Sequence, residues 1–306
     1  MVEITAGLVK ELREKSGAGM MDCKMALTEN DGNIDLSIDW LRAKGITKAA
    51  KKSDRIASEG LIGSLIKNGS AAMIELNSET DFVARNDEFQ DLLRGILEVS
   101  IDNDEVESVQ YQDTGRTVAE EINEKIATIG ENIMLRRVTK YENIEDEHIF
   151  SYTHNAVAES LGKIGVLVAI KSKSSIDNLA DFGKNICMHI AATNPLALAS
   201  NEISPELIER EKQIALEQAR ESGKPENIIE KMVEGRIKKF TEENALLSQV
   251  FVIDGETKIE KLLENKSSDL NEEIIITRFT RMQLGDGIEK KEDDFAGEVA
   301  AAISKN

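Results

Sequence analysis

Two short apolar segments meet at the dipeptide Asn68-Gly69. The first contains Leu61-Ile62 and Leu65-Ile66, and the second is Met73-Ile74-Glu75-Leu76. Asn-Gly readily adopts the two positive φ angles that a tight two-residue hairpin turn requires. The pattern therefore predicts an antiparallel β-hairpin and commits this part of the chain to a sheet.

Helical patterns follow the predicted hairpin. Phe89, Leu92, Leu93 and Ile96 recur at helical spacing, and a further apolar helix follows a segment, Thr117 to Glu120, with the spacing of a capping box. Ile133-Met134-Leu135 then returns to a strand pattern. Strands and helices are segregated along the chain, and this arrangement predicts the α+β class.

The N-terminal residues have a different pattern, in which apolar residues recur only at helical spacing. Three short helices are predicted, with Ser16-Gly17-Ala18-Gly19 ending the first, Asn33 capping the third and Gly45 stopping it. We assign residues 1–55 to a three-helix module. So small a core suits the presentation of a surface better than the enclosure of a site.

The second half of the chain contains another α+β unit with an insertion. Strands are predicted at 150–152, 164–170, 250–253 and 274–276, with a helix between Leu179 and Ile190. Two charged helices broken at Gly223-Lys224-Pro225 predict a hairpin of two helices. The predicted divisions are core subdomain N at 56–141, core subdomain C at 142–282 with the hairpin at about 203–244, and a C-terminal helical module at 283–306.

Composition limits the classes of partner and compartment. The 38 basic and 57 acidic residues give a net charge of −19, which disfavours direct nucleic-acid binding. No apolar run reaches the length of a membrane span, and the N-terminus resembles neither a signal nor a transit peptide, so we expect a cytoplasmic protein. Two separated cysteines and three scattered histidines predict neither a disulfide framework nor a metal site. The basic stretch from Lys44 to Arg55 is either a tether or a contact surface.

No catalytic motif is recognisable in the sequence. The one segment whose residues suggest a functional role is Thr80-Asp81-Phe82. An aromatic side chain directly after an acidic one, at a strand-to-helix transition, can project from the surface. The alternative is that Asp81 or Asn86 caps a helix and Phe82 folds onto its own core.

Several motifs together resemble one family. Leu12 to Lys24, Asn77 to Arg85, Ile129 to Ile133, Ser151 to His154 and Lys231 to Arg236 are similar, in order, to the signatures of elongation factor Ts. The likeness covers nearly the whole chain. Met25, Asn155 and Ile253 depart from the family pattern, and the first two leave contact detail open.

The resemblance implies a UBA-like (ubiquitin-associated-like) N-terminal module, a two-subdomain α+β core with an antiparallel coiled-coil hairpin, and a C-terminal helix. It also implies a nucleotide exchange factor with elongation factor Tu as its partner. It implies no catalytic residue, no metal site and no cofactor of its own, because such a factor acts on the Mg²⁺ and GDP that its partner holds. The partner-binding residues that it implies are Asp81, Phe82, Thr80, Val83, Lys10, Arg13, Met20, Met21, Lys24, Ile129, Gly130, His154, Val252 and Ile253.

Two other classes of function stay open at this point. An adaptor that recruits partners through the three-helix module would have Phe82 buried and dispensable. An enzyme would have a deep pocket lined by carboxylates with shifted pKa values. The hairpin could also mediate homodimerisation or contact the partner, and the sequence does not decide this.

Overall fold

The computed structural model describes residues 4–44, 52–221 and 224–289. Its N-terminal part is a small bundle of helices α1 (Ala6–Ser16), α2 (Met20–Glu29) and α3 (Ile34–Ala43). Gly17 ends α1 with a φ of 63°, and the side chain of Asn33 caps α3 by accepting the N–H of Leu36. These two predicted boundaries are confirmed. The bundle core is small, and its fully buried side chains are Leu12, Cys23, Ala26, Leu27 and Leu41.

The predicted hairpin is confirmed as the centre of the first sheet. Strands β1 (Glu59–Lys67) and β2 (Ser70–Ser78) pair antiparallel across Asn68 and Gly69, whose φ angles of 53° and 81° are both positive. Strand β3 (Ile133–Tyr141) pairs with β2, and the short β5 (Leu161–Gly162) pairs with β1. The strand order is β3-β2-β1-β5.

Helices cover the outer face of this sheet. They are α4 (Asp81–Ala84), α5 (Asp87–Ser100) and α6 (Val118–Ile129), with 3-10 turns η1 (Val106–Ser108) and η2 (Gln112–Thr114) between the last two. The predicted capping box is present, because Thr117 and Glu120 each bond the other's backbone N–H. Phe89, Leu93 and Ile96 of α5 pack with Leu61 and Ile74 of the sheet in the largest apolar cluster.

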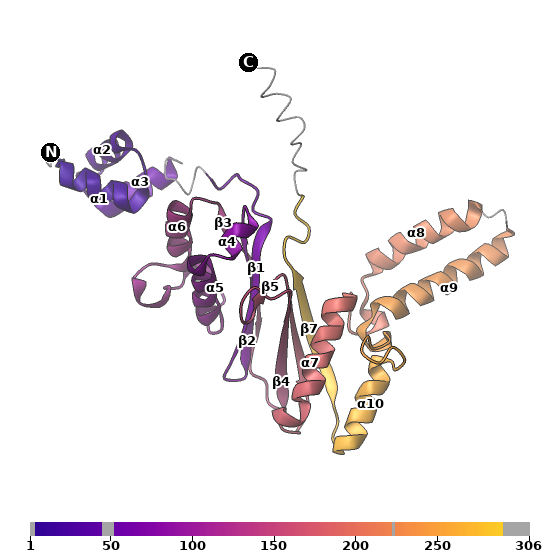
Figure 1. Cartoon of the computed structure of the whole chain (residues 1–306). Coiled ribbons are helices and arrows are strands. Elements are labelled where there is room, and N and C mark those ends of the chain that lie inside the picture. Colours follow the sequence, from indigo (N-terminus) through magenta and orange to yellow (C-terminus); the bar gives the residue numbers. More distant parts are fainter. Residues whose placement is uncertain (1–3, 45–51, 222–223, 290–306) are drawn as a thin grey trace.

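The second sheet has the strand order β4-β6-β7, with β4 (Glu147–His154), β6 (Ile164–Lys171) and β7 (Ile275–Gln283). Its apolar cluster includes Leu179, Ile186 and Ile190 of α7 (Ile176–Thr193), together with Ile259 and Leu263 of α10 (Ile259–Leu270). The two sheets pack on each other through a third cluster, which contains Ile62, Met73, Tyr141, Ile149, Leu167, Ala169 and Met282. Figure 1 shows the resulting layers of helices, sheet, sheet and helices, which confirm the α+β class.

Helices α8 (Pro205–Glu221) and α9 (Glu226–Asn244) form a pair that extends away from the layers (Figure 1). A 3-10 turn lies before the pair and another after it, η3 (Ser200–Glu202) and η4 (Leu246–Ser248). Small side chains, Ala215 and Ala219, lie between the helices against Ile229 and Val233. Arg236 also reaches Glu211 at 2.8 Å. The predicted helical hairpin is therefore present, and coiled-coil winding stays a prediction.

One predicted strand is wrong. Residues 250–253 form an isolated bridge followed by a turn, in which the N–H of Gly255 donates to the carbonyl of Phe251. A run of apolar residues suggests a strand, but only Phe251 of the last three is buried, and Val252 and Ile253 are exposed. Helix α10 was not anticipated. The predicted stop at Gly45 and the C-terminal helix near Phe295 lie outside the described residues.

Candidate partner-binding surface

The segment after β2 presents an aromatic side chain to the solvent. Phe82 is 79% exposed, while Val83 and Ala84 beside it are buried and hold α4 on the core. Asp81 is half exposed and lies 3.7 Å from Arg85, and Asn86 caps α5 by accepting the N–H of Glu88. Phe82 is thus not folded onto its own core, and the adaptor hypothesis, which required it to be buried, loses its main prediction.

Glu131, the residue after Gly130, binds the same segment. The Glu131 carboxylate accepts the backbone N–H of Thr80 at 2.9 Å and the Thr80 hydroxyl at 2.6 Å. Thr80 is only partly exposed in this arrangement. Its hydroxyl is therefore already engaged within the chain.

The end of α6 lies next to the exposed aromatic. Gly130 ends this helix with a φ of 93°, in the region where glycine is favoured. A shallow depression is lined by Phe82, Val83, Asn86, Glu88, Thr128 and Ile129. The structure therefore brings Phe82 and Ile129 together, although 46 residues separate them in the sequence.

A groove between the N-terminal bundle and α6 contains the predicted residues of the bundle. Lys10, Arg13, Met20, Met21 and Lys24 all line it, opposite Glu124, Ala127 and Thr128 of α6. Met20 is 64% exposed and Met21 is 76% exposed. Thr128 lines both this groove and the depression beside Phe82, so the two hollows are neighbours on one surface.

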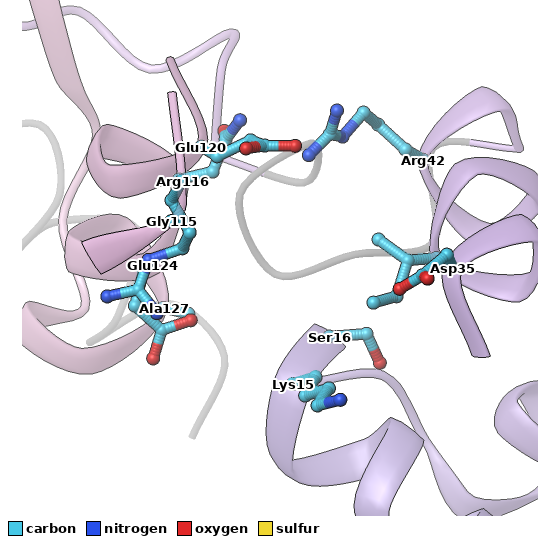
Figure 2. A pocket seen from close by; sticks show the side chains of 11 residues that line it. Lys15, Ser16, Asp35, Arg42, Gly115, Arg116, Glu120, Glu124 and Ala127 are labelled. Atoms are coloured by element: carbon cyan, nitrogen blue, oxygen red, sulfur yellow. The ribbon is translucent and has the colours of Figure 1, made fainter. Parts of the chain in front are cut away.

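A second, more polar cleft lies between the bundle and α6. It is lined on the bundle side by Lys15, Ser16, Asp35, Ile38 and Arg42, and on the core side by Gly115, Arg116, Glu120, Asn123, Glu124 and Ala127. Figure 2 shows Arg42 extended toward Glu120 across this cleft. Charges of opposite sign therefore face each other where the bundle approaches the core.

Three other predicted residues lie elsewhere. His154 ends β4, is exposed, and its Nδ1 lies 3.1 Å from the hydroxyl of Tyr152. Strand pairing places this end of β4 at the same end of the core as the segment that follows β2. Val252 and Ile253 lie on the turn between η4 and α10, and are 46% and 54% exposed.

Buried His189 fixes the turn that carries Val252 and Ile253. Its Nδ1 accepts the N–H of Val252 at 3.3 Å, so Nε2 carries the proton and donates to Gln249 Oε1 at 2.9 Å. Burial lowers the pKa of His189, against the opposing effect of the bond to Gln249. This histidine is a structural residue that sequence reasoning had left unassigned.

Several residues at the surface were missed from the sequence. Glu131 belongs to a motif from which only Ile129 and Gly130 were assigned, and Thr128 precedes that motif. Two members of the basic stretch contact the core. Lys52 donates to the carbonyl of Gly130, and Arg55 lies 3.4 Å from Glu79. Lys48 and Lys51 lie outside the described residues.

Possible metal ligands, thiols and membrane-crossing helices bear on the class of site. Among the described residues, no group of three or more His, Cys, Asp or Glu side chains could hold a metal ion. Both cysteines are buried, and burial raises the pKa of each thiol. None of the described helices combines the length and apolar character needed to cross a bilayer. Exposed apolar side chains grouped beside charged ones are typical of a protein-binding surface.

Fold and surface together define the class, an α+β protein with an exposed apolar surface of the kind typical of protein-binding proteins. The family model for Elongation factor TS matches residues 79–286. The chain is 55% identical over 305 residues to elongation factor Ts of Allorhizobium ampelinum and 53% identical over 305 residues to that of Agrobacterium fabrum, in each case over 98% of this chain and 99% of the relative. It is 52% identical to elongation factor Ts of Sinorhizobium medicae over 303 residues, which is 98% of both chains.

The chain belongs to the elongation factor Ts family. Membership implies a nucleotide exchange factor for elongation factor Tu in translation elongation, and not a catalyst of a chemical reaction. The resemblance read from the sequence motifs is thereby confirmed.

Proposed function

We propose that this protein binds elongation factor Tu carrying GDP and inserts the Asp81–Phe82 turn beside the partner's Mg²⁺ and phosphates. The exposure of Phe82, 79% on a turn anchored by buried neighbours, carries this proposal. Fully exposed aromatic side chains are costly in water, and burial against a partner recovers apolar contact. The proposal places the protein in the cytoplasm, where translation elongation takes place.

The mechanism is displacement without bond chemistry. Mg²⁺ needs a near-ideal octahedron of oxygen ligands, and in GTPases it bridges the protein and the phosphates. Phe82 acts as an apolar wedge that shifts the partner's elements around the metal, and Asp81 engages polar groups next to it. Loss of the metal and loss of the diphosphate are then linked, and GDP leaves.

The rest of the surface supplies affinity. The groove residues Lys10, Arg13, Met20, Met21 and Lys24 orient the bundle against the same partner domain, and Ile129 and Gly130 extend the contact around Phe82. His154, Val252 and Ile253 contact the partner from the core. Val83 acts differently, because its side chain is buried and supports the turn from below.

Exchange is coupled in both directions. A factor that weakens nucleotide binding is itself bound more weakly in the presence of nucleotide, by the same ratio. The protein therefore accelerates release and rebinding through a transient ternary complex, and the relative concentrations of GTP and GDP decide which nucleotide rebinds.

Release of a fluorescent GDP from elongation factor Tu, chased with unlabelled GDP, tests the proposal with wild-type protein, Phe82→Ala and Ile144→Ala. Ile144 is a matched control, because it is 46% exposed on the connection between β3 and β4, at the opposite end of the sheets. Losing the buried aromatic contact should slow release by about tenfold to a hundredfold.

Ile144→Ala should accelerate GDP release from elongation factor Tu as much as the wild type does. Failure of the wild-type protein to accelerate release from its own elongation factor Tu would refute the proposed function. Equal release rates with Phe82→Ala and with the wild type would show that Phe82 is not the wedge and that another part of the surface displaces the nucleotide.

A further inference from the structure

We infer that Glu131, with Glu79, positions the Asp81–Phe82 turn for entry into the partner. The inference rests on the proposed function and assigns to it residues that do not touch the nucleotide site. Glu131 and Glu79 each bind the segment on which the other lies. They are positioning residues, because they act through the turn.

The two carboxylates form a reciprocal clamp. Glu131 accepts the N–H and the hydroxyl of Thr80, at 2.9 and 2.6 Å. Glu79, whose side chain is 20% exposed, accepts the N–H of Asn132 at 2.6 Å. Each bond joins the segment after β2 to the segment after α6, and hydrogen bonds to an ionised acceptor are stronger than neutral ones.

The orientation of the helix that carries Phe82 is set by contacts with other parts of the chain. Helix α4 has only four residues, which is too short to be stable alone. Thr80 is its N-cap residue, and a threonine at this position commonly caps its own helix through its hydroxyl. Here the Thr80 side chain makes no capping bond within α4, and its hydroxyl donates to Glu131 instead. Besides the burial of Val83 and Ala84, the direction of the turn therefore depends on the bonds that Glu131 makes from outside the helix.

The clamp also reaches the segment that leads from the N-terminal bundle. The side-chain amide of Asn132 donates to the carbonyl of Arg55 at 2.8 Å, and the Arg55 guanidinium lies 3.4 Å from Glu79. Lys52 donates to the carbonyl of Gly130. The base of the turn, the end of α6 and the residues Lys52 and Arg55 thus meet at one junction.

The test measures GDP release at saturating factor with Glu131→Ala, Glu131→Gln and the matched control Glu145→Ala. Glu145 is an exposed acid on the connection between β3 and β4, away from the turn. Glu131→Ala removes both hydrogen bonds to Thr80. Loss of one charge-assisted hydrogen bond corresponds to about tenfold in an equilibrium constant, so the maximal rate should fall by at least about tenfold. Glu131→Gln retains one acceptor oxygen and should fall between Glu131→Ala and the wild type.

A double-mutant cycle with Phe82→Ala separates positioning from an independent contact. If Glu131 acts through the turn, Glu131→Ala causes a clearly smaller loss of rate in the Phe82→Ala protein than in the wild type, because only Asp81 is then left to be positioned. Additive losses, or a wild-type rate for Glu131→Ala, would overturn the inference. Circular dichroism melting of each variant checks that the core stays folded, and Glu131→Gln carries the test if the alanine variant does not fold.

Amide hydrogen exchange gives a readout that does not need the partner. Residues 80–84 should exchange faster in Glu131→Ala than in the wild type, with no change in β1 or β6. Unchanged exchange in this segment would contradict the clamp even if nucleotide release were slow. If the wild-type protein does not accelerate GDP release from elongation factor Tu, but residues 80–84 still exchange faster in Glu131→Ala, the proposed function fails and the clamp stands.

Discussion

At the scale of single residues, buried polar groups hold the exposed ones in place. His189 is fully buried and bonds both the Val252 backbone and the Gln249 side chain. The amide of Gln249 also donates to the carbonyl of Glu243, at the end of α9. One imidazole therefore connects α7 to the turn that carries Val252 and Ile253. The bond to Val252 requires an unprotonated Nδ1.

This requirement predicts a pH-dependent stability. Burial lowers the pKa of His189, so as pH falls below about 6.5 the unfolded chain takes up a proton that the folded protein excludes. The unfolded state then binds more protons, and the free energy of unfolding decreases. The contribution is fully present above this pH and is lost as pH falls toward the lowered pKa.

Urea unfolding of the wild type and of His189→Asn between pH 8 and pH 5 measures this contribution. Asparagine offers an acceptor close to the place of Nδ1 and does not titrate in this range. The wild type should be the more stable protein at pH 8, and the difference should narrow below about pH 6.5. A difference that stays constant across the range would show that His189 does not titrate with unfolding.

At the scale of elements, the close approach of the two sheets depends on a glycine in β6. A Cβ atom built on Gly165 would lie 2.5 Å from Cγ2 of Ile62 and 2.7 Å from Sδ of Met73. Both neighbours are buried in the cluster between the sheets. Gly165→Ala should lower the free energy of unfolding by about 1 to 3 kcal/mol, because a close-packed core yields little to an added methyl group.

Gly235→Ala is the control for this substitution. Gly235 lies inside α9, and apart from the adjoining backbone of its own helix nothing lies within 4 Å of a built Cβ. Alanine there should be neutral or stabilise by up to about 1 kcal/mol. Urea unfolding of both variants makes the comparison. Equal effects of the two substitutions would mean that the sheets separate easily at Gly165.

Elements with local signals could be predicted from the sequence, and those fixed by distant contacts could not. The Asn68-Gly69 turn and the Thr117 capping box depend on a few adjacent residues, and both are confirmed. The predicted strand at 250–253 failed because His189, about 60 residues away, holds the Val252 backbone in a turn. Phe82 illustrates the same limit at the candidate site, since aromatic residues are usually buried and the local pattern alone left exposure and burial both open.

At the scale of the whole molecule, a buried carboxylate joins the first sheet to the segment that follows the second. Glu75 is fully buried in β2, and its Oε1 accepts the N–H of Gly285 at 2.8 Å. Arg136 and Arg137 on β3 both pair with Glu75, and they donate to the carbonyls of Asp286 and Gln283 at 2.5 and 2.6 Å. These contacts span about 150 to 210 residues of sequence, which explains why the pattern of β2 alone gave no sign of them.

Removing this carboxylate should cost far more than removing an exposed one. Glu75→Ala leaves two guanidinium groups, with side chains 23% and 31% exposed, without their shared partner, and we expect a loss of about 3 kcal/mol in the free energy of unfolding. Glu98→Ala is the control, because its ion pair with Lys67 is about half exposed and should contribute less than about 1 kcal/mol. Urea unfolding measures both variants, and amide exchange at Gly285 should accelerate only in Glu75→Ala. If Glu75→Ala lost no more stability than Glu98→Ala, the cluster between the sheets would hold the halves together without help from the carboxylate.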